Sequence, residues 1–299
     1  MRNFTFKGLF LAAMFMVLGS LAIQAADDGL IIKQITVKLE KAGTLPDRIG
    51  STKRNKITNL KIIGEINGTD LRVIRYMSNR DTGGKLAILD LSEAKIVRGG
   101  DYYYYDYEEF YTHDNELGTH AFYGCRGLTS LTLPSGLTSI GSWAFTGCSG
   151  LTSLSLPSGV TSIGDGAFFG LSSLTSLSLP SGLTSIGDGT FYGCSGLTSI
   201  YVYAEKMPKL GTNMFGGCDA KKCTVYVPKG TYDDYWLSEF GYFENIVEFE
   251  ATGINNVITS NDAKELSRYS VNGQRLSAPT KGLNIVKYSD GSVKKVAVQ

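Results

Sequence analysis

The sequence feature that most constrains the fold is a 23-residue pattern that recurs through residues 121–200. The pattern begins at Ala121 and restarts at Ala144, at Ala167 and, with one change, at Thr190. Equivalent positions form columns, among them Cys125, Cys148, Leu171 and Cys194, then Pro134, Pro157 and Pro180, and also Ile140, Ile163 and Ile186. A fixed period of about 20 to 30 residues that contains Leu-x-x-Leu-x-Leu is typical of a solenoid. Its coils must stack, because no single coil can bury its own apolar side.

Each copy of the pattern predicts one coil. Leu131-Thr132-Leu133 alternates apolar with polar residues, which predicts a strand with one buried face. Pro134 lacks an N–H and ends this strand, and Ser135-Gly136 turns the chain. Ile140 and Phe145 then return apolar side chains to the interior. The repeat therefore predicts a β-rich scaffold with one continuous core.

Residues 121–200 carry few charges and many hydroxyl groups. Only Arg126, Asp165 and Asp188 are charged, whereas 27 of the 80 residues are Ser or Thr. A surface this neutral does not attract a polyanion, and the net charge of the chain is only +1, so nucleic acid is not expected as a partner. Two interpretations of the hydroxyl groups stay open. In the first, the serines and threonines are ordinary surface residues that suit a strand. In the second, their hydroxyl groups recognise a protein or a glycan through many short hydrogen bonds.

The N-terminus has the pattern of a targeting segment. Arg2 and Lys7 precede an uncharged stretch over residues 8–26. Polar and glycine residues shorten its apolar part to about a dozen residues, whereas a membrane-spanning helix needs about 20. Residues 1–25 are therefore predicted to be a cleaved signal peptide. The mature chain is expected to be exported, to the cell surface or outer membrane or the extracellular space, with no integral membrane segment.

Export makes the five cysteines candidates for disulfide bonds. Three of them share a column with Leu171, and a position that also accepts leucine is an apolar core position, which predicts free, buried thiols. Cys218 continues this column one residue late, and Cys223 follows it, so a Cys218–Cys223 bridge stays open as an alternative. A zinc site is not expected, because no Cys-x-x-Cys pair occurs and the chain has two histidines.

The segments on either side of the repeat have patterns of their own. Residues 26–85 are predicted to be an N-terminal capping region, with a strand at 31–39 and a helix at 70–77 whose N-cap is Asp70. Terminal coils of repeat proteins are atypical because one side must face water.

Residues 86–250 are predicted to form the solenoid proper. Its C-terminal cap is expected to contain a short amphipathic helix at 231–240 that uses Tyr235, Trp236 and Phe240. Residues 253–299 are predicted to be a separate β module. Two hairpins are expected there, one around Asn272-Gly273 and one around Asp290-Gly291.

An insertion at residues 98–116 interrupts the period and carries a cluster of aromatic residues. Insertions in repeat proteins form loops that often lie on the binding side, and exposed tyrosines give contact area at small entropic cost. The predicted binding residues are Tyr102, Tyr103, Tyr104, Tyr105, Tyr107, Phe110 and Tyr111. The alternative is a solvated or locally packed loop without function.

Neither a metal site nor a catalytic site is predicted. His113, Asp114, Glu116 and His120 offer metal-ligating groups, but His120 falls in the corner column of Trp143, Gly166 and Gly189. The glycine-rich segments at 164–170 and 187–193 are repeat corners with the wrong spacing for phosphate loops. There is no nucleophile elbow and no His-Glu-x-x-His. The chain is therefore predicted to be no enzyme and to need no cofactor.

The motif A-F-x-G-C-x-x-L-x-x-[LI]-x-[LV]-P resembles the BspA-type leucine-rich repeats of bacterial surface proteins. The beginning, Asn67-Gly-Thr-Asp70-Leu71, and the ending, Val225-Tyr-Val-Pro228, are similar to the same family. The resemblance covers roughly residues 57–250 and implies a leucine-rich-repeat solenoid. Members of the family are implicated in adhesion to host matrix proteins and to other bacteria. No binding motif of the family can be transferred residue by residue.

The C-terminal residues 253–299 resemble the sorting domain of substrates of type IX secretion, although they are shorter than most such domains. Together these features predict an exported leucine-rich-repeat protein that mediates adhesin-like protein–protein binding at the cell surface, with a host or bacterial surface protein or glycan as partner. The alternative is a glycan-binding or accessory protein of a surface enzyme system, with its site on the Ser/Thr-rich sheet or the Tyr-rich insertion.

Overall fold

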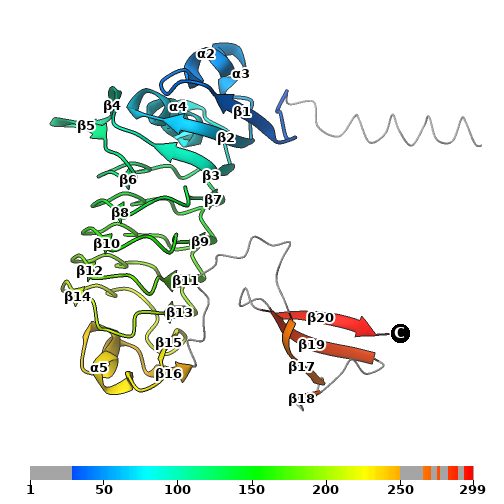
Figure 1. Cartoon of the computed structure of the whole chain (residues 1–299), viewed down its shortest axis with the longest axis vertical. Helices are drawn as coiled ribbons and strands as arrows, with labels where there is room; N and C mark the ends of the chain where they lie inside the picture. Colours follow the sequence, from blue (N-terminus) through cyan, green and yellow to red (C-terminus); the bar gives the residue numbers. More distant parts are fainter. Residues whose placement is uncertain (1–28, 250–264, 271–274, 277–281, 289–292, 299) are drawn as a thin grey trace, which may run out of the picture.

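The computed structural model describes residues 29–249 and the backbone of four C-terminal strands, at 265–270, 275–276, 282–288 and 293–298. The predicted signal peptide and the segment that joins the solenoid to the C-terminal strands lie outside the described residues. Figure 1 shows a stack of coils with helices at both ends. No helix among the described residues is long and apolar enough to cross a membrane.

One long parallel sheet follows the solenoid from its first coil to its last, in the order β1-β2-β3-β7-β9-β11-β13-β15-β16. Its strands are β1 (Ile35–Leu39), β2 (Asn59–Ile66), β3 (Ile88–Ile96), β7 (Ser130–Thr132), β9 (Ser153–Ser155), β11 (Ser176–Leu179), β13 (Ser199–Val202), β15 (Thr224–Pro228) and β16 (Asn245–Phe249). The repeat fixes the register, because Leu131 pairs with Leu154, and Leu154 with Leu177. We call this sheet the main sheet.

A second parallel sheet is built from two-residue strands in the order β14-β12-β10-β8-β6. Its three central strands, β8, β10 and β12, each follow a Pro-Ser-Gly turn. Its strands are β6 (Glu116–Leu117), β8 (Ser139–Ile140), β10 (Ser162–Ile163), β12 (Ser185–Ile186) and β14 (Lys209–Leu210). We call it the small sheet. The coils that begin with β3, β7, β9, β11 and β13 thus contribute one strand to each sheet, whereas the coils at the two ends contribute to the main sheet alone (Figure 1). The predicted β-rich repeat solenoid is confirmed.

The core between the two sheets is ordered by its aromatic residues. Phe122, Phe145, Phe168, Phe191 and Phe215 are all at least 99% buried and stack face to face in succession. Their ring centroids are 5.5–5.6 Å apart and neighbouring rings are within 8° of parallel. Ring stacking of this kind adds to the free energy of burying each phenylalanine. The column that the sequence predicts to be core is therefore a continuous stack of rings.

Two columns of threonine tie successive coils together. Thr138, Thr161 and Thr184 lie just before the small sheet, and the hydroxyl of each donates to the backbone carbonyl one coil earlier, at 2.8–3.2 Å. The hydroxyls of Thr129, Thr175 and Thr198, before the main sheet, do the same at 3.0–3.3 Å. Much of the threonine on this solenoid is therefore used within the fold, which favours the structural interpretation for these two columns.

The N-terminal cap consists of α2 (Leu45–Ile49), α3 (Ser51–Arg54), α4 (Gly68–Ser78) and the short 3-10 helix η1 (Arg80–Thr82). The expected N-cap of α4, Asp70, is wrong, because the helix begins earlier and Asn67 is its N-cap. Asp70 is the N3 residue of a capping box, in which each side chain binds the other's backbone. It is fully buried and also accepts hydrogen bonds from the backbone N–H groups of Gly43 and Leu45. The carboxylate thus joins the first loop to α4.

The C-terminal cap contains α5 (Tyr232–Trp236) and the 3-10 helix η2 (Glu239–Tyr242). The expected single helix at 231–240 is therefore two short pieces. Tyr235 and Phe240 close the end of the core as predicted, but Trp236 is 44% exposed and stacks on Tyr232 instead. One residue of the predicted apolar face is thus on the surface.

The C-terminal strands form a four-stranded antiparallel sheet in the order β18-β17-β19-β20. Its strands are β17 (Glu265–Ser270), β18 (Arg275–Leu276), β19 (Gly282–Tyr288) and β20 (Val293–Val298). The pairs β17–β18 and β19–β20 are antiparallel, as expected for the two predicted hairpins. The turns themselves lie outside the described residues.

Candidate functional site

The insertion at 98–116 is a β-hairpin rather than the expected loop. Strand β4 (Gly99–Asp106) pairs with β5 (Glu108–Thr112), and the single residue Tyr107 makes the turn with a positive φ of 61°. The hairpin leaves the stack near β6 and projects beyond the coils in Figure 1. A regular element holds side chains in fixed directions, so the tyrosines form a defined surface.

The predicted aromatic residues divide into an inner and an outer set. Tyr103 is only 3% exposed, and its hydroxyl donates to the Thr119 carbonyl at 2.6 Å. Its predicted exposure is therefore wrong, and burial raises its pKa well above the usual value. Tyr104 is half-buried, with its ring 4.9 Å from the ring of His120 and 6.1 Å from that of Phe110. These residues fix the hairpin to the solenoid.

The outer set is available for contact. Tyr107 is 97% exposed, Tyr105 is 62% exposed and Tyr111 is 44% exposed. Tyr102 is half-buried, with the Arg72 guanidinium 5.3 Å from its ring centre. The structure thus keeps Tyr105, Tyr107 and Tyr111 as exposed candidates from the predicted set.

Helix α4 braces the hairpin from the N-terminal side. Arg72 pairs with Asp101 at 2.6 Å, and Arg75 donates to the Ala121 carbonyl at 2.8 Å. The Arg75 guanidinium also lies 4.4 Å from the ring centre of Tyr104, a distance suited to a cation–π interaction. Because the hairpin is attached by charged and aromatic contacts to a helix, its exposed tyrosines are presented on a rigid support.

Below the hairpin lies an open groove of about 660 Å³. One wall is β5, through Glu108, Glu109, Phe110 and Tyr111, and the other is the outer face of the small sheet from β6 to β12. We call it the hairpin groove. His113 and Glu116 also line it, whereas His120 lies in the corner column, with a φ of 59° that matches 58° at Trp143. Burial lowers the pKa of His120. No group of metal-ligating residues among the described ones could hold a metal ion.

The structure shows a second aromatic surface that sequence analysis missed. Tyr123, Trp143, Phe169 and Tyr192 come from four successive coils and are each 36–39% exposed. Trp143 is 6.0 Å from Phe169, and Phe169 is stacked 5.2 Å from Tyr192. We call these four residues the aromatic stripe. Tyr104 joins it to the hairpin, because its ring lies 5.7 Å from that of Tyr123. The signal was in the sequence, since three of the four directly follow a core phenylalanine.

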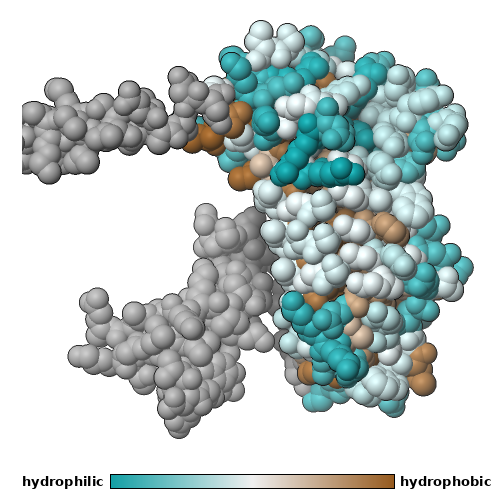
Figure 2. Space-filling view, turned by 180° about the vertical axis from the view of Figure 1, so that it is seen from behind, coloured by the Kyte–Doolittle hydropathy of each residue, from teal (hydrophilic) through white to brown (hydrophobic). Residues whose placement is uncertain are grey.

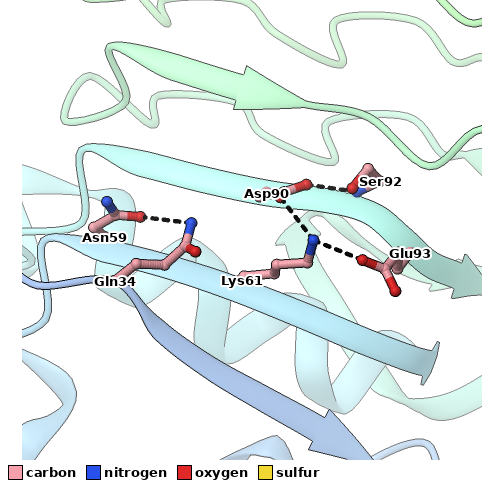
Figure 3. Close-up of polar contacts among 6 residues, drawn as sticks. All are labelled: Gln34, Asn59, Lys61, Asp90, Ser92 and Glu93. Atoms are coloured by element: carbon pink, nitrogen blue, oxygen red, sulfur yellow. Dashed lines mark hydrogen bonds and ion pairs between the residues drawn. The ribbon is translucent and has the colours of Figure 1, made fainter. Parts of the chain in front are cut away.

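The outer face of the main sheet differs along its length. At its N-terminal end, Lys61 bridges Glu93 at 2.6 Å and Asp90 at 3.3 Å (Figure 3). The hydrogen bond to Glu93 is the largest of the effects that raise the pKa of Lys61. For Asp90, burial favours protonation, but hydrogen bonds from Ser92 and the Lys61 charge together lower the pKa.

At the C-terminal end of the main sheet, the rings of Tyr201 and Tyr226 stack 4.5 Å apart. Between these two ends the main sheet presents serine and threonine. Figure 2 shows, on one face of the solenoid, mostly pale surface with some hydrophobic patches between strongly hydrophilic groups.

All five cysteines lie in the described part of the chain and are free and buried, so the Cys218–Cys223 bridge is not formed. The thiol of Cys148 donates to the Phe122 carbonyl, and Cys218 makes the equivalent contact with Phe191. Cys218 therefore does continue the column. Burial raises the pKa of Cys125 to about 11 and that of Cys223 to about 12. Thiols of this kind are inert core residues.

Comparison with known proteins gives one family match and several similar solved structures. Residues 115–233 match the family described as BspA type leucine rich repeat region, in six copies. Similar solved structures include a leucine-rich-repeat protein of T. pallidum (21% identity, 67% of this chain and 69% of that chain, TM-score 0.34). Others come from Eubacterium ventriosum (16%, 74% and 81%, 0.31) and Bacteroides ovatus (18%, 76% and 74%, 0.25). No curated protein matches the chain. The part of the solenoid at residues 115–233 is therefore similar in sequence to the BspA-type leucine-rich repeat family.

Proposed function

We propose that this chain is an exported surface protein that binds another protein in an adhesin-like manner through the hairpin and the adjoining aromatic stripe. The observation that carries the proposal is the exposure of Tyr105, Tyr107 and Tyr111 on a hairpin that α4 holds in place. Tyrosine is among the residues that supply most of the binding energy in protein interfaces. A rigid support lowers the entropy lost on binding.

The aromatic stripe extends this surface along the solenoid. Three rung spacings of about 4.8 Å separate Tyr123 from Tyr192, so the stripe is about 14 Å long. An exposed aromatic surface of this length on a neutral scaffold is typical of an interaction site. Leucine-rich repeats are generally non-enzymatic and consistent with protein binding, which agrees with this proposal.

Export and surface display are the second part of the proposal. Residues 1–25 would direct export, and the four-stranded C-terminal sheet at residues 265–298 would act as the sorting signal. Deletion of residues 251–299 should then leave a folded solenoid that is no longer displayed on the cell surface. Display is measured by whether protease added to whole cells can digest the protein. Normal display of the shortened protein would contradict the sorting role.

The test of binding uses the mature chain, residues 26–299, against immobilised extracellular-matrix proteins. The triple variant Tyr105→Ser, Tyr107→Ser, Tyr111→Ser should reduce affinity at least tenfold, since each side chain is expected to contribute about 1 kcal/mol or more. The matched control is Tyr232→Ser, an exposed tyrosine on the C-terminal cap. If the triple variant and the control bound the matrix protein with equal affinity, the exposed hairpin tyrosines would not be part of the binding site.

Glycan binding is the alternative that the surface also favours. Ser130, Thr132, Ser153 and Ser155 are exposed on the main sheet, and they make no side-chain hydrogen bond to another described residue. Groups of this kind suit recognition of sugar hydroxyls. A signal on a glycan array that survives the triple tyrosine variant and is lost on Ser130→Val, Ser153→Val would favour this site on the main sheet.

A further inference from the structure

Strand β5 has an open edge. It pairs with β4, and no other strand among the described residues pairs with it. An unpaired strand edge presents a row of backbone donors and acceptors, to which an extended peptide can add as a further strand. Five of the residues that line the hairpin groove, at 108–111 and 113, come from β5 or follow it directly. The strand available for pairing therefore faces an open groove.

The opposite wall of the hairpin groove offers hydrogen-bonding groups that the fold leaves unused. Ser139, Ser162 and Ser185 occupy the same position in β8, β10 and β12, and all three line the groove. Their hydroxyls make no hydrogen bond to another described residue. The threonine directly before each of these serines, in contrast, donates its hydroxyl to a backbone carbonyl of the preceding coil. The serine column can therefore receive a ligand without breaking a contact of the scaffold.

The charge of the groove is one-sided. Glu108, Glu109 and Glu116 line it, and no lysine or arginine does so among the described residues. The Tyr111 hydroxyl donates to the Glu109 carboxylate, which holds this carboxylate beside β5. Three carboxylates without a counter-charge favour a cationic ligand. They also oppose pairing of β5 with β5 of a second copy, because that arrangement would bring the glutamates together.

We propose that an extended segment of the partner protein, carrying lysine or arginine, adds to β5 as a third strand and lies in the hairpin groove against the serine column. This inference rests on the proposed protein-binding function and specifies its mode. Backbone pairing with β5 supplies affinity, and the three glutamates select the charge of alternate side chains. Tyr105 and Tyr107 contact the same partner outside the groove, and Tyr111 contacts it at the groove wall.

The test uses a fluorescein-labelled octapeptide of alternating lysine and threonine, with blocked ends, titrated with the mature chain in 0.15 M salt. We expect saturable binding by fluorescence anisotropy. The same peptide with N-methyl groups on its four central amides keeps its charge but cannot pair as a strand, and it should bind at least tenfold more weakly. An octapeptide of alternating glutamate and threonine should not bind.

Variants of the protein locate the site. Glu108→Gln, Glu109→Gln, Glu116→Gln together should weaken binding of the lysine peptide by at least about tenfold, because three exposed charge pairs are lost. The control is Glu205→Gln, an exposed carboxylate far from the groove in sequence, which should leave affinity unchanged. Circular dichroism checks that each variant stays folded.

Three results would overturn the strand-addition mode: no binding of the lysine peptide, equal binding of its N-methylated form, or equal binding to the triple glutamine variant. The protein-binding function would survive any of these if a matrix protein still bound the mature chain and lost affinity in the triple tyrosine variant. If the triple tyrosine variant instead kept its affinity for the matrix protein while the lysine peptide still bound, the tyrosines would not belong to the site. Strand addition to β5 would still hold.

Discussion

The packing of Trp143 in the aromatic stripe can be tested by two glycine substitutions that differ in one contact. Gly166 and Gly189 occupy the same corner of successive coils, with φ angles of 57° and 58°. A Cβ atom built on Gly166 would lie 2.3 Å from the Trp143 ring, whereas one on Gly189 would meet nothing within 4 Å. Gly166→Ala should therefore destabilise the protein more than Gly189→Ala does.

The difference can be estimated from the structure. Both alanines would adopt a left-handed conformation, which costs about 1–2 kcal/mol. In Gly166→Ala the Trp143 ring must also move by about 1 Å or more. This ring is 39% exposed, so of the roughly 250 Å² of a tryptophan side chain about 150 Å² is buried. Exposing half of that area costs about 2 kcal/mol, at about 25 cal/mol per Å². The expected costs are about 1–2 kcal/mol for Gly189→Ala and about 3–4 kcal/mol for Gly166→Ala.

Urea unfolding followed by far-ultraviolet circular dichroism measures both costs. The chain has two tryptophans, so a Trp236→Phe background leaves Trp143 as the single tryptophan, which can be excited selectively. Its emission should shift to longer wavelength in Gly166→Ala only. In a Trp143→Ala background the two glycine variants should cost the same. The reasoning would be refuted if the two costs were equal with Trp143 present and its emission did not change.

Three further perturbations test the cap, the hairpin and the cysteine column. Asp70→Ala should destabilise the protein by about 3 kcal/mol in urea unfolding, because it leaves buried N–H groups such as that of Leu45 without an acceptor, whereas the exposed Asp81→Ala should cost under about 0.5 kcal/mol. Tyr103→Phe should cost about 1 kcal/mol through loss of its bond to the Thr119 carbonyl, and a cost near zero would mean that this bond is replaced. Burial raises the pKa of Cys125 in the folded state to about 11. The contribution of this thiol to the free energy of unfolding should therefore be fully present below about pH 9 and be lost as the pH rises through 11. The loss of stability should be smaller in Cys125→Ala, and an equal loss in both proteins would contradict the burial of this thiol.

The parts of the fold that the sequence predicted well are those that repeat by translation. Identical residues one period apart must stack, so the strand-ending prolines, the buried cysteine column and the inward position of Phe145 followed from the repeat alone. The face-to-face stacking of the phenylalanine rings was not predicted. Leu171 was informative because it showed that the column of Cys148 is apolar. The same reasoning placed His120 in a corner, where its φ of 59° agrees with that of its column.

The candidate site was harder to predict because it depends on contacts between segments with different patterns. Four tyrosines in a row show no alternation, so the sequence did not reveal that Tyr103 faces the solenoid and binds the Thr119 carbonyl. The partner of Tyr104 is Arg75, from α4, far away in the sequence. The aromatic stripe was missed for a different reason. The column that contains Tyr123, Phe169 and Tyr192 also contains Thr146. A column that varies in this way did not indicate a continuous aromatic surface.

The bonds between coils have a consequence for how such a protein changes over generations. Each coil joins the next through the same atoms, as at Thr161 and Thr184, so the joint does not depend on which copy is used. Unequal recombination between the nearly identical copies can then add or remove 23 codons without disturbing either cap. A chain lengthened in this way would gain one rung of about 4.8 Å on the stripe and on the serine column at once. The length of the binding surface can therefore change in steps of one coil, while the hairpin at its N-terminal end stays the same.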